Sequence, residues 1–235
     1  MFKKTLATAA TLLALASGAA NAAVITDTVE ADRAATNFTD QVLTFDKFDT
    51  LGGTRELVAV NISLFGEIDG VAKVENFSAS SGAEITALIS ALLKLTSFDG
   101  TQLVTALPEV YKEFSASAFD GEADWAGTSG HTFDDVYANA TQANYITDQA
   151  ILDMFTGTGA IDTYLSASAN TQASGGGNIF SGFETFADGA VTITYEHKAV
   201  TPPDQNVTVP VSSSFLLLGA GMLGLASRRK VKVEA

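Results

Sequence analysis

The sequence predicts an all-β protein, a single antiparallel β-sandwich with at most one or two short helices. The first observation is the stretch 55–65, where apolar and polar side chains alternate as in a half-buried strand. This alternation directs four side chains to the core: Val58, Val60, Ile62 and Leu64. The second is the stretch 191–195, where β-branched residues precede a tyrosine. The third is a set of four Asp-Gly dipeptides, which suit the positive φ angles of tight turns.

Further short strands are expected between these turn signals. They are predicted at residues 24–30, 38–48, 71–79, 101–106, 110–118, 132–146 and 161–170. Because Asp69-Gly70 joins two alternating runs directly, a hairpin is predicted there. The Gly-rich stretch 170–178 is expected to be a loop.

Two segments carry helical patterns. Residues 85–95 fit helical i, i+3, i+4 spacing and strand alternation about equally well, so periodicity leaves both open. Residues 149–155 predict a short helix, because Asp148 is a suitable N-cap in front of them.

The N-terminus predicts a signal peptide over residues 1–22. Lys3 and Lys4 precede an apolar stretch at 6–16, and Ala20-Asn21-Ala22 fits a small-x-small cleavage site. Export through the Sec machinery would therefore give a mature chain that starts at Ala23. The sandwich is assigned to residues 23–200 as an ectodomain.

The C-terminus predicts a sorting tail. Residues 201–210 read as a linker because they contain three prolines, and residues 211–235 read as an apolar helix with a basic tail. Sixteen apolar helical residues rise about 24 Å, slightly less than the roughly 30 Å hydrocarbon core of a bilayer. The basic cluster Arg228, Arg229 and Lys230 would stay cytoplasmic, which places the ectodomain outside.

Charge and composition narrow the function classes. Without the two terminal segments, residues 23–210 keep seven basic and 26 acidic residues, a formal charge of −19. Such a surface repels nucleic acid, so no nucleic-acid partner is expected. The absence of Cys excludes disulfides and thiolate chemistry, so stability must come from the hydrophobic core.

Few residues suggest chemistry. Asp120, Glu122 and Asp124 alternate and would share one face of a strand, so calcium is kept as a hypothesis, with no other cofactor expected. Two carboxylates could also form a glycosidase pair. His131 and His197 belong to no metal or catalytic motif. Sugar-binding faces usually use several Trp or Tyr, and Trp125 is the single Trp of the chain.

Two family resemblances follow from these residues. The tail, with Val209-Pro210, the Gly-containing apolar run from Phe215 and the basic end, resembles PEP-CTERM sorting signals, although Val211 and Ser212 replace the usual Glu and Pro. That resemblance implies an exosortase-like sorting enzyme in a Gram-negative bacterium.

The body of the chain resembles the choice-of-anchor E family. The matching stretches are 43–49, 57–65, 125–130, 155–159, 177–178 and 191–195, in that order. That family implies an extracellular β-rich domain without described catalytic residues, and it slightly favours a strand over residues 85–95. The expectation is an exported protein, held briefly in the inner membrane and then at the surface or in the matrix. Its role would be structural or adhesive in the envelope or biofilm, without catalysis. The alternative is an anchored protein that binds or hydrolyses glycans through acidic residues, with extracellular polysaccharide as the partner.

Overall fold

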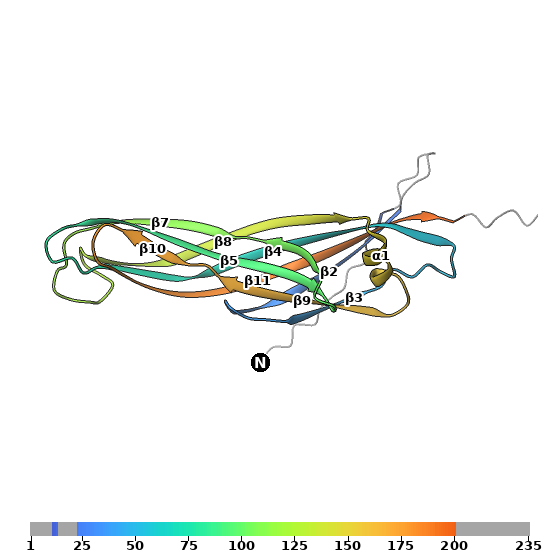
Figure 1. Ribbon diagram of the computed structural model, residues 1–235, viewed down its shortest axis with the longest axis horizontal. Helices are drawn as coiled ribbons and strands as arrows, with labels where there is room; N and C mark the ends of the chain where they lie inside the picture. The colour runs from blue at the N-terminus through green and yellow to red at the C-terminus, as the bar shows by residue number, and fades with distance from the viewer. Residues whose placement is uncertain (1–10, 14–22, 201–235) are drawn as a thin grey trace, which may run out of the picture. The chain divides into compact units, whose positions relative to one another are not determined.

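The computed structural model describes residues 11–13 and 23–200 and consists of two antiparallel sheets packed face to face (Figure 1). The first sheet has the order β1 (Thr11–Leu13), β2 (Ala23–Ala35), β11 (Ile179–Ala199), β4 (Arg55–Asn76) and β8 (Gly130–Ile146). The second is built around β5 (Ala83–Ser97) and contains β3 (Gln41–Asp46), β6 (Gln102–Ala106), β7 (Glu109–Ala116), β9 (Ala160–Ala169) and β10 (Gln172–Gly175). The predicted all-β sandwich is therefore confirmed.

The ambiguous segment 85–95 lies within strand β5. Every second residue is buried between the sheets: Ile85, Ala87, Ile89, Ala91, Leu93 and Leu95. β9 and β10 follow one another along one edge of β5, and β7 and β6 follow one another along the other. The segment is a strand because both of its edges have partners, which local periodicity does not reveal.

Strand β4 confirms most of the predicted inward face. Val60, Ile62 and Leu64 are fully buried, whereas Val58 is only half-buried. The pairing with β11 passes from Ala59 directly to Leu57, so Val58 sits at a β-bulge and Leu57 takes the core position. Each fully buried Leu, Ile or Val contributes about 1.5–3 kcal/mol, which matters in a chain without disulfides.

The hairpin predicted at Asp69-Gly70 is wrong. Asp69-Gly70 and Asp188-Gly189 lie inside the long strands β4 and β11, and each sits at a register shift against the neighbouring outer strand. A Cβ at Gly70 would collide with the carbonyl oxygen of Glu184 in β11. In both strands the glycine therefore permits a β-bulge and a close approach of the neighbouring backbone, and it does not form a turn. The other two Asp-Gly pairs lie outside the strands, and both of their glycines have positive φ.

The predicted helix is confirmed as α1 (Gln149–Phe155). The Asp148 side chain accepts hydrogen bonds from the N–H groups of Ala150 and Ile151, at 3.0 and 3.3 Å. Leu152 and Phe155 are buried against the sandwich. The predicted loop 170–178 is partly wrong, because its central residues form β10 and extend the row begun by β9.

The terminal predictions fall mostly beyond the residues that the structure describes. Of the predicted signal peptide, the structure describes only β1, which pairs with Val24, Ile25 and Thr26 of β2. The sorting residues lie outside the described part of the chain: Val209, Pro210, Arg228, Arg229 and Lys230. Within residues 11–13 and 23–200, no helix is long and apolar enough to span a membrane.

Candidate functional site

Three loops meet at the end of the sandwich opposite α1 (Figure 1). They are residues 77–82 between β4 and β5, 117–129 between β7 and β8, and 176–178 between β10 and β11. Backbone hydrogen bonds join them. Phe77 donates to Asn178 at 2.8 Å, and Phe119 donates to Ser78 at 2.9 Å. The loop end is therefore one connected surface.

A buried carboxylate anchors the longest of these loops. Glu75, near the end of β4, lies between Phe180 of β11 and Gly130 of β8 and is 1% exposed. Its side chain accepts hydrogen bonds from the N–H of Trp125 at 2.8 Å and from the hydroxyl of Ser129 at 2.7 Å. A side chain at Gly130 would collide with this carboxylate, so the glycine makes room for the loop to cover it.

Asn76 adds a second buried anchor beside Glu75. Its amide donates to the carbonyl oxygens of Ser81 at 2.9 Å and Ser117 at 2.7 Å, and its Oδ1 accepts from the N–H of Ser78 at 3.0 Å. One side chain thus ties two loops to the end of β4. Because buried polar groups are stable only when they are paired, this network fixes the loop conformations.

Four aromatic rings from three segments pack together on this end. We name Phe77, Phe119, Trp125 and Phe180 the aromatic end cluster. The ring centroids of Trp125 and Phe180 lie 4.9 Å apart with an interplanar angle of 18°. Phe77 lies 5.5 Å from Phe180 and 5.0 Å from Phe119. Trp125 lies over Gly182, has φ of 62°, and is half-buried, while Phe180 is 52% exposed.

The predicted calcium residues lie on the loop that carries Phe119 and Trp125, and they do not converge. Residues 117–129 form a loop, so the shared strand face expected for Asp120, Glu122 and Asp124 does not exist. Asp120 accepts from the N–H of Glu122, which lowers the pKa of the Asp120 carboxyl, and Asp124 accepts from the N–H of Ala126. Among residues 11–13 and 23–200, no three His, Cys, Asp or Glu side chains are grouped to hold a metal. Calcium binding stays a prediction for a melting experiment.

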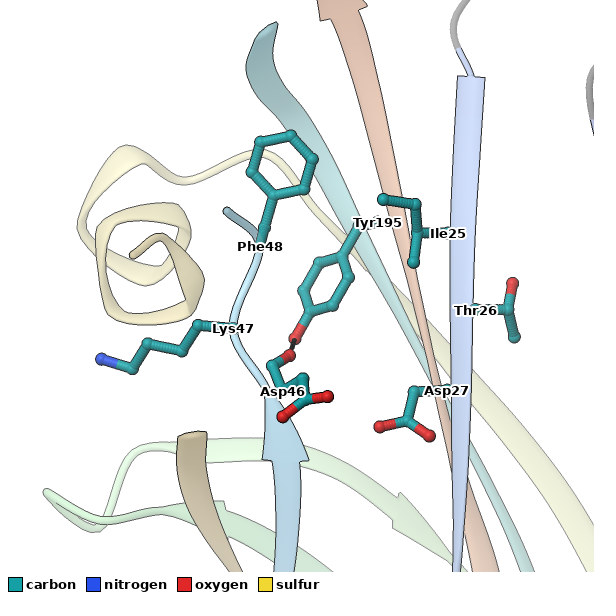
Figure 2. A pocket seen from close by; sticks show the side chains of 7 residues that line it. All are labelled: Ile25, Thr26, Asp27, Asp46, Lys47, Phe48 and Tyr195. Atoms are coloured by element: carbon teal, nitrogen blue, oxygen red, sulfur yellow. Dashed lines mark hydrogen bonds between the residues drawn. The ribbon is translucent and has the colours of Figure 1, made fainter. Parts of the chain in front are cut away.

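A small pocket lies near the other end, between β2, β11 and the end of β3 (Figure 2). It has a volume of about 90 Å³ and is lined by Ile25, Thr26, Asp27, Asp46, Lys47, Phe48 and Tyr195. The Tyr195 hydroxyl donates to the backbone carbonyl of Asp46 at 2.8 Å, and burial raises the pKa of this phenol far above its ordinary value. The carboxylates of Asp27 and Asp46 lie on the same side of the Tyr195 hydroxyl in Figure 2. The pocket is well below the roughly 300–1,000 Å³ of typical ligand sites, so it suits water or a small ion.

A charged cluster occupies the surface of the first sheet. Arg33 forms a bidentate pair with Asp69 at 2.8 and 2.6 Å, and its guanidinium lies 3.8 Å from the centroid of the Phe186 ring. Partial burial and the neighbouring Glu67 raise the pKa of Asp188 to about 6. This carboxyl therefore changes its charge in a mildly acidic medium.

The two histidines pack against aromatic rings. His131 stacks on Phe114 with 5.0 Å between ring centroids, and His197 lies 5.3 Å from Phe48. Burial, followed by the nearby Arg55, lowers the pKa of His197, which favours the neutral ring. Their positions are consistent with packing roles.

Comparison with known proteins gives only distant matches. No protein-family model and no curated protein matches the chain. The Gx strain structure of infectious bursal disease virus is 13% identical, with a TM-score of 0.19, over 91% of this chain and 53% of the viral chain. The crystal structure of the T13 particle of that virus is 11% identical, with a TM-score of 0.19, over 83% and 45% of the chains. This chain thus spans about half the length of the viral chains, and similarity at this level supports no functional conclusion.

The aromatic end cluster was not predicted from the sequence. Its members come from three segments of the chain and become neighbours only through the sheet order β11-β4-β8. Glu75 was also missed, because a carboxylate near the end of a strand is normally exposed to solvent. Two glycines are the sequence signal for the covered site: Gly130, which lies opposite Glu75, and Gly182, which lies under Trp125.

Proposed function

We propose that this chain is an exported bacterial surface or matrix protein with an adhesive, non-catalytic role. The observation that carries the proposal is the aromatic end cluster, a set of rings held outside the core on loops that a buried polar network fixes. Exposed aromatic groups on a fixed surface favour contact with a partner. The export signal and sorting tail predicted at the two ends, and the resemblance to choice-of-anchor E and PEP-CTERM proteins, support the same role.

Glycan hydrolysis is the alternative that involves the pocket. Asp27 and Asp46 both line it, and carboxylate pairs are the usual groups of glycoside hydrolases. A volume of about 90 Å³ offers little room for a sugar ring between these two carboxylates. Glycan hydrolysis would gain support if the purified protein released reducing sugar and lost this activity in Asp27→Asn and Asp46→Asn.

A deletion strain tests the adhesive role. We expect weaker surface attachment or matrix cohesion than in the parent, with recovery when the intact gene is returned. Normal attachment and a normal matrix in the deletion strain would contradict the proposal. Labelling of intact cells with an antibody against the ectodomain provides the control for exposure at the surface.

A further inference from the structure

We propose that the aromatic end cluster binds an amino-sugar polymer, with sugar rings against Trp125 and Phe180 and protonated amines against the exposed carboxylates of the loop 117–129. This inference rests on the proposed adhesive role, for which it names the partner.

The cluster is separate from the hydrophobic core that stabilises the sandwich. None of its four rings belongs to the buried core of residues 23–200 or to the half-buried residues packed against it. Phe180 keeps 52% of its surface exposed, although it extends from a central strand. A ring of this kind offers an apolar face of the size that a pyranose ring covers with its C–H groups.

The rings are fixed before any ligand arrives. The N–H of Trp125 is bonded to Glu75, and its carbonyl accepts from the hydroxyl of Thr132 at 3.1 Å. The indole lies against Phe180 on one side and over Gly182, where a Cβ would come within 3.8 Å of it. Because both backbone groups of Trp125 are bonded, little conformational entropy remains to be lost on binding.

The charge of the three loops selects the kind of polymer. Residues 77–82, 117–129 and 176–178 contain three acidic residues, Asp120, Glu122 and Asp124, and no Lys, Arg or His. All three acidic residues are exposed. Lys73, opposite Gly182 in the sheet, is the basic residue in register with the cluster. A polymer with uronic acids or phosphates would be repelled, whereas protonated amines are attracted to the carboxylates and to the aromatic faces.

Polar groups suited to sugar hydroxyls complete the surface. Ser80, Asn178 and Thr128 are exposed on the same three loops. Aromatic, hydroxyl, amide and carboxylate groups on the same loops suit a sugar, which has apolar ring faces and a polar edge. A protein partner would instead favour a broader apolar surface.

The fluorescence of Trp125 provides a direct test because this residue is the only Trp of the chain. The full-length protein would be titrated with a glucosamine hexamer and, separately, an N-acetylglucosamine hexamer, at matched ionic strength. A detergent without sugar head groups would keep the chain soluble. We expect saturable quenching or a shift of the emission with the glucosamine hexamer, and binding at least about tenfold weaker with the acetylated one. Equal binding of both hexamers, or no emission change with either, would overturn the proposal.

Matched variants separate this site from attraction by the acidic surface as a whole. With calorimetry as the readout, Phe180→Ala and Asp120→Asn/Asp124→Asn should weaken hexamer binding about tenfold and severalfold, respectively. Two controls should stay within about twofold. The aromatic control is Tyr111→Ala, exposed on β7, and the charge control is Glu109→Gln/Glu113→Gln on the same strand. Equal losses in site and control variants would mean that binding is general electrostatic attraction.

Two further measurements keep the result interpretable. The circular dichroism spectra and melting temperatures of all variants should match those of the native protein. If Phe180→Ala is unstable, Phe180→Leu replaces it as a milder variant that keeps an apolar side chain. A deletion strain that recovers attachment with the Phe180→Ala gene would retain the adhesive role and reject the sugar site.

Discussion

Replacing Gly70 with alanine should destabilise the sandwich more than any ordinary surface change. Gly70 has φ of +153°, which L side chains rarely adopt, and an added Cβ would collide with the carbonyl oxygen of Glu184 in β11. Such backbone strain costs about 1–3 kcal/mol, and relieving the collision by separating two central strands costs about as much again. We expect a loss of about 4 kcal/mol in the free energy of unfolding. For a domain of this size, that corresponds to a melting temperature roughly 10 °C lower.

Two glycine variants provide the controls. At Gly66 the nearest atom to an added Cβ is the flexible end of Leu93 at 2.9 Å, so Gly66→Ala should cost only about 1 kcal/mol. At Gly176 nothing lies within 4 Å, so Gly176→Ala should be neutral or slightly stabilising. Thermal melts followed by circular dichroism would give all three values. A Gly70→Ala variant that melts within about 2 °C of the native protein would refute the close approach of β4 and β11.

Four further predictions concern the loops, pH, calcium and processing. Glu75→Ala should lower the free energy of unfolding by about 3 kcal/mol, because it leaves two hydrogen-bond donors unpaired, whereas Glu75→Gln should lower it by about 1 kcal/mol. A red shift of the Trp125 fluorescence in Glu75→Ala, and not in Glu75→Gln, would show that the loop is released. The raised pKa of Asp188, about 6, means that the folded state binds this proton more tightly than the unfolded state. Its stabilising effect is complete below about pH 4 and is lost as the pH rises through 6. Solvent screening reduces this pH-dependent change in the free energy of unfolding to about 1 kcal/mol. It is measured as the difference in the free energy of unfolding between the native protein and Asp188→Asn at each pH. A difference that stays constant from pH 4 to pH 7, roughly, would contradict the prediction. At matched ionic strength, calcium should raise the melting temperature of the native protein but not of Asp120→Asn/Asp124→Asn; equal shifts in both would exclude the site. Mass spectrometry of the released protein should find Ala23 at its start and an end near Val209-Pro210, and an intact basic terminus outside the cell would argue against tail processing.

The strands could be predicted because alternation is a local property. Residues 55–65 and 191–195 repeat every second position, and both lie in the central strands β4 and β11. The continuity of these strands could not be predicted in the same way. Asp69-Gly70 favours a turn when only its neighbours in sequence are considered, and the structure uses it as a bulge because β8 and β11 flank it on either side. Tertiary pairing thus decided between two conformations that the dipeptide permits.

The candidate site depends even more on tertiary structure. Phe77 follows a strand and Phe180 lies at the start of another, so the sequence favours burial for both. Phe180 stays exposed because it lies on the outer face of the first sheet, whereas its neighbour Ile179 packs against the core. Phe77 is half-buried in the loop that follows β4. Trp125 adopts a positive φ that no local motif encodes, and its position follows from the hydrogen bond to Glu75.

The buried Glu75 explains why the loop end is ordered in a protein with so few stabilising devices. Removing a carboxylate from water is costly, and this cost is offset here only because both oxygens accept hydrogen bonds. The two hydrogen bonds that it accepts, from the Trp125 N–H and the Ser129 hydroxyl, define one conformation of residues 117–129. The buried carboxylate therefore fixes the geometry of a surface that lies outside the hydrophobic core. A fixed group of partly exposed rings outside the core is difficult to explain as packing alone. This is why the loop end, and not the small pocket beside Tyr195, is the part of this molecule that we connect with its function.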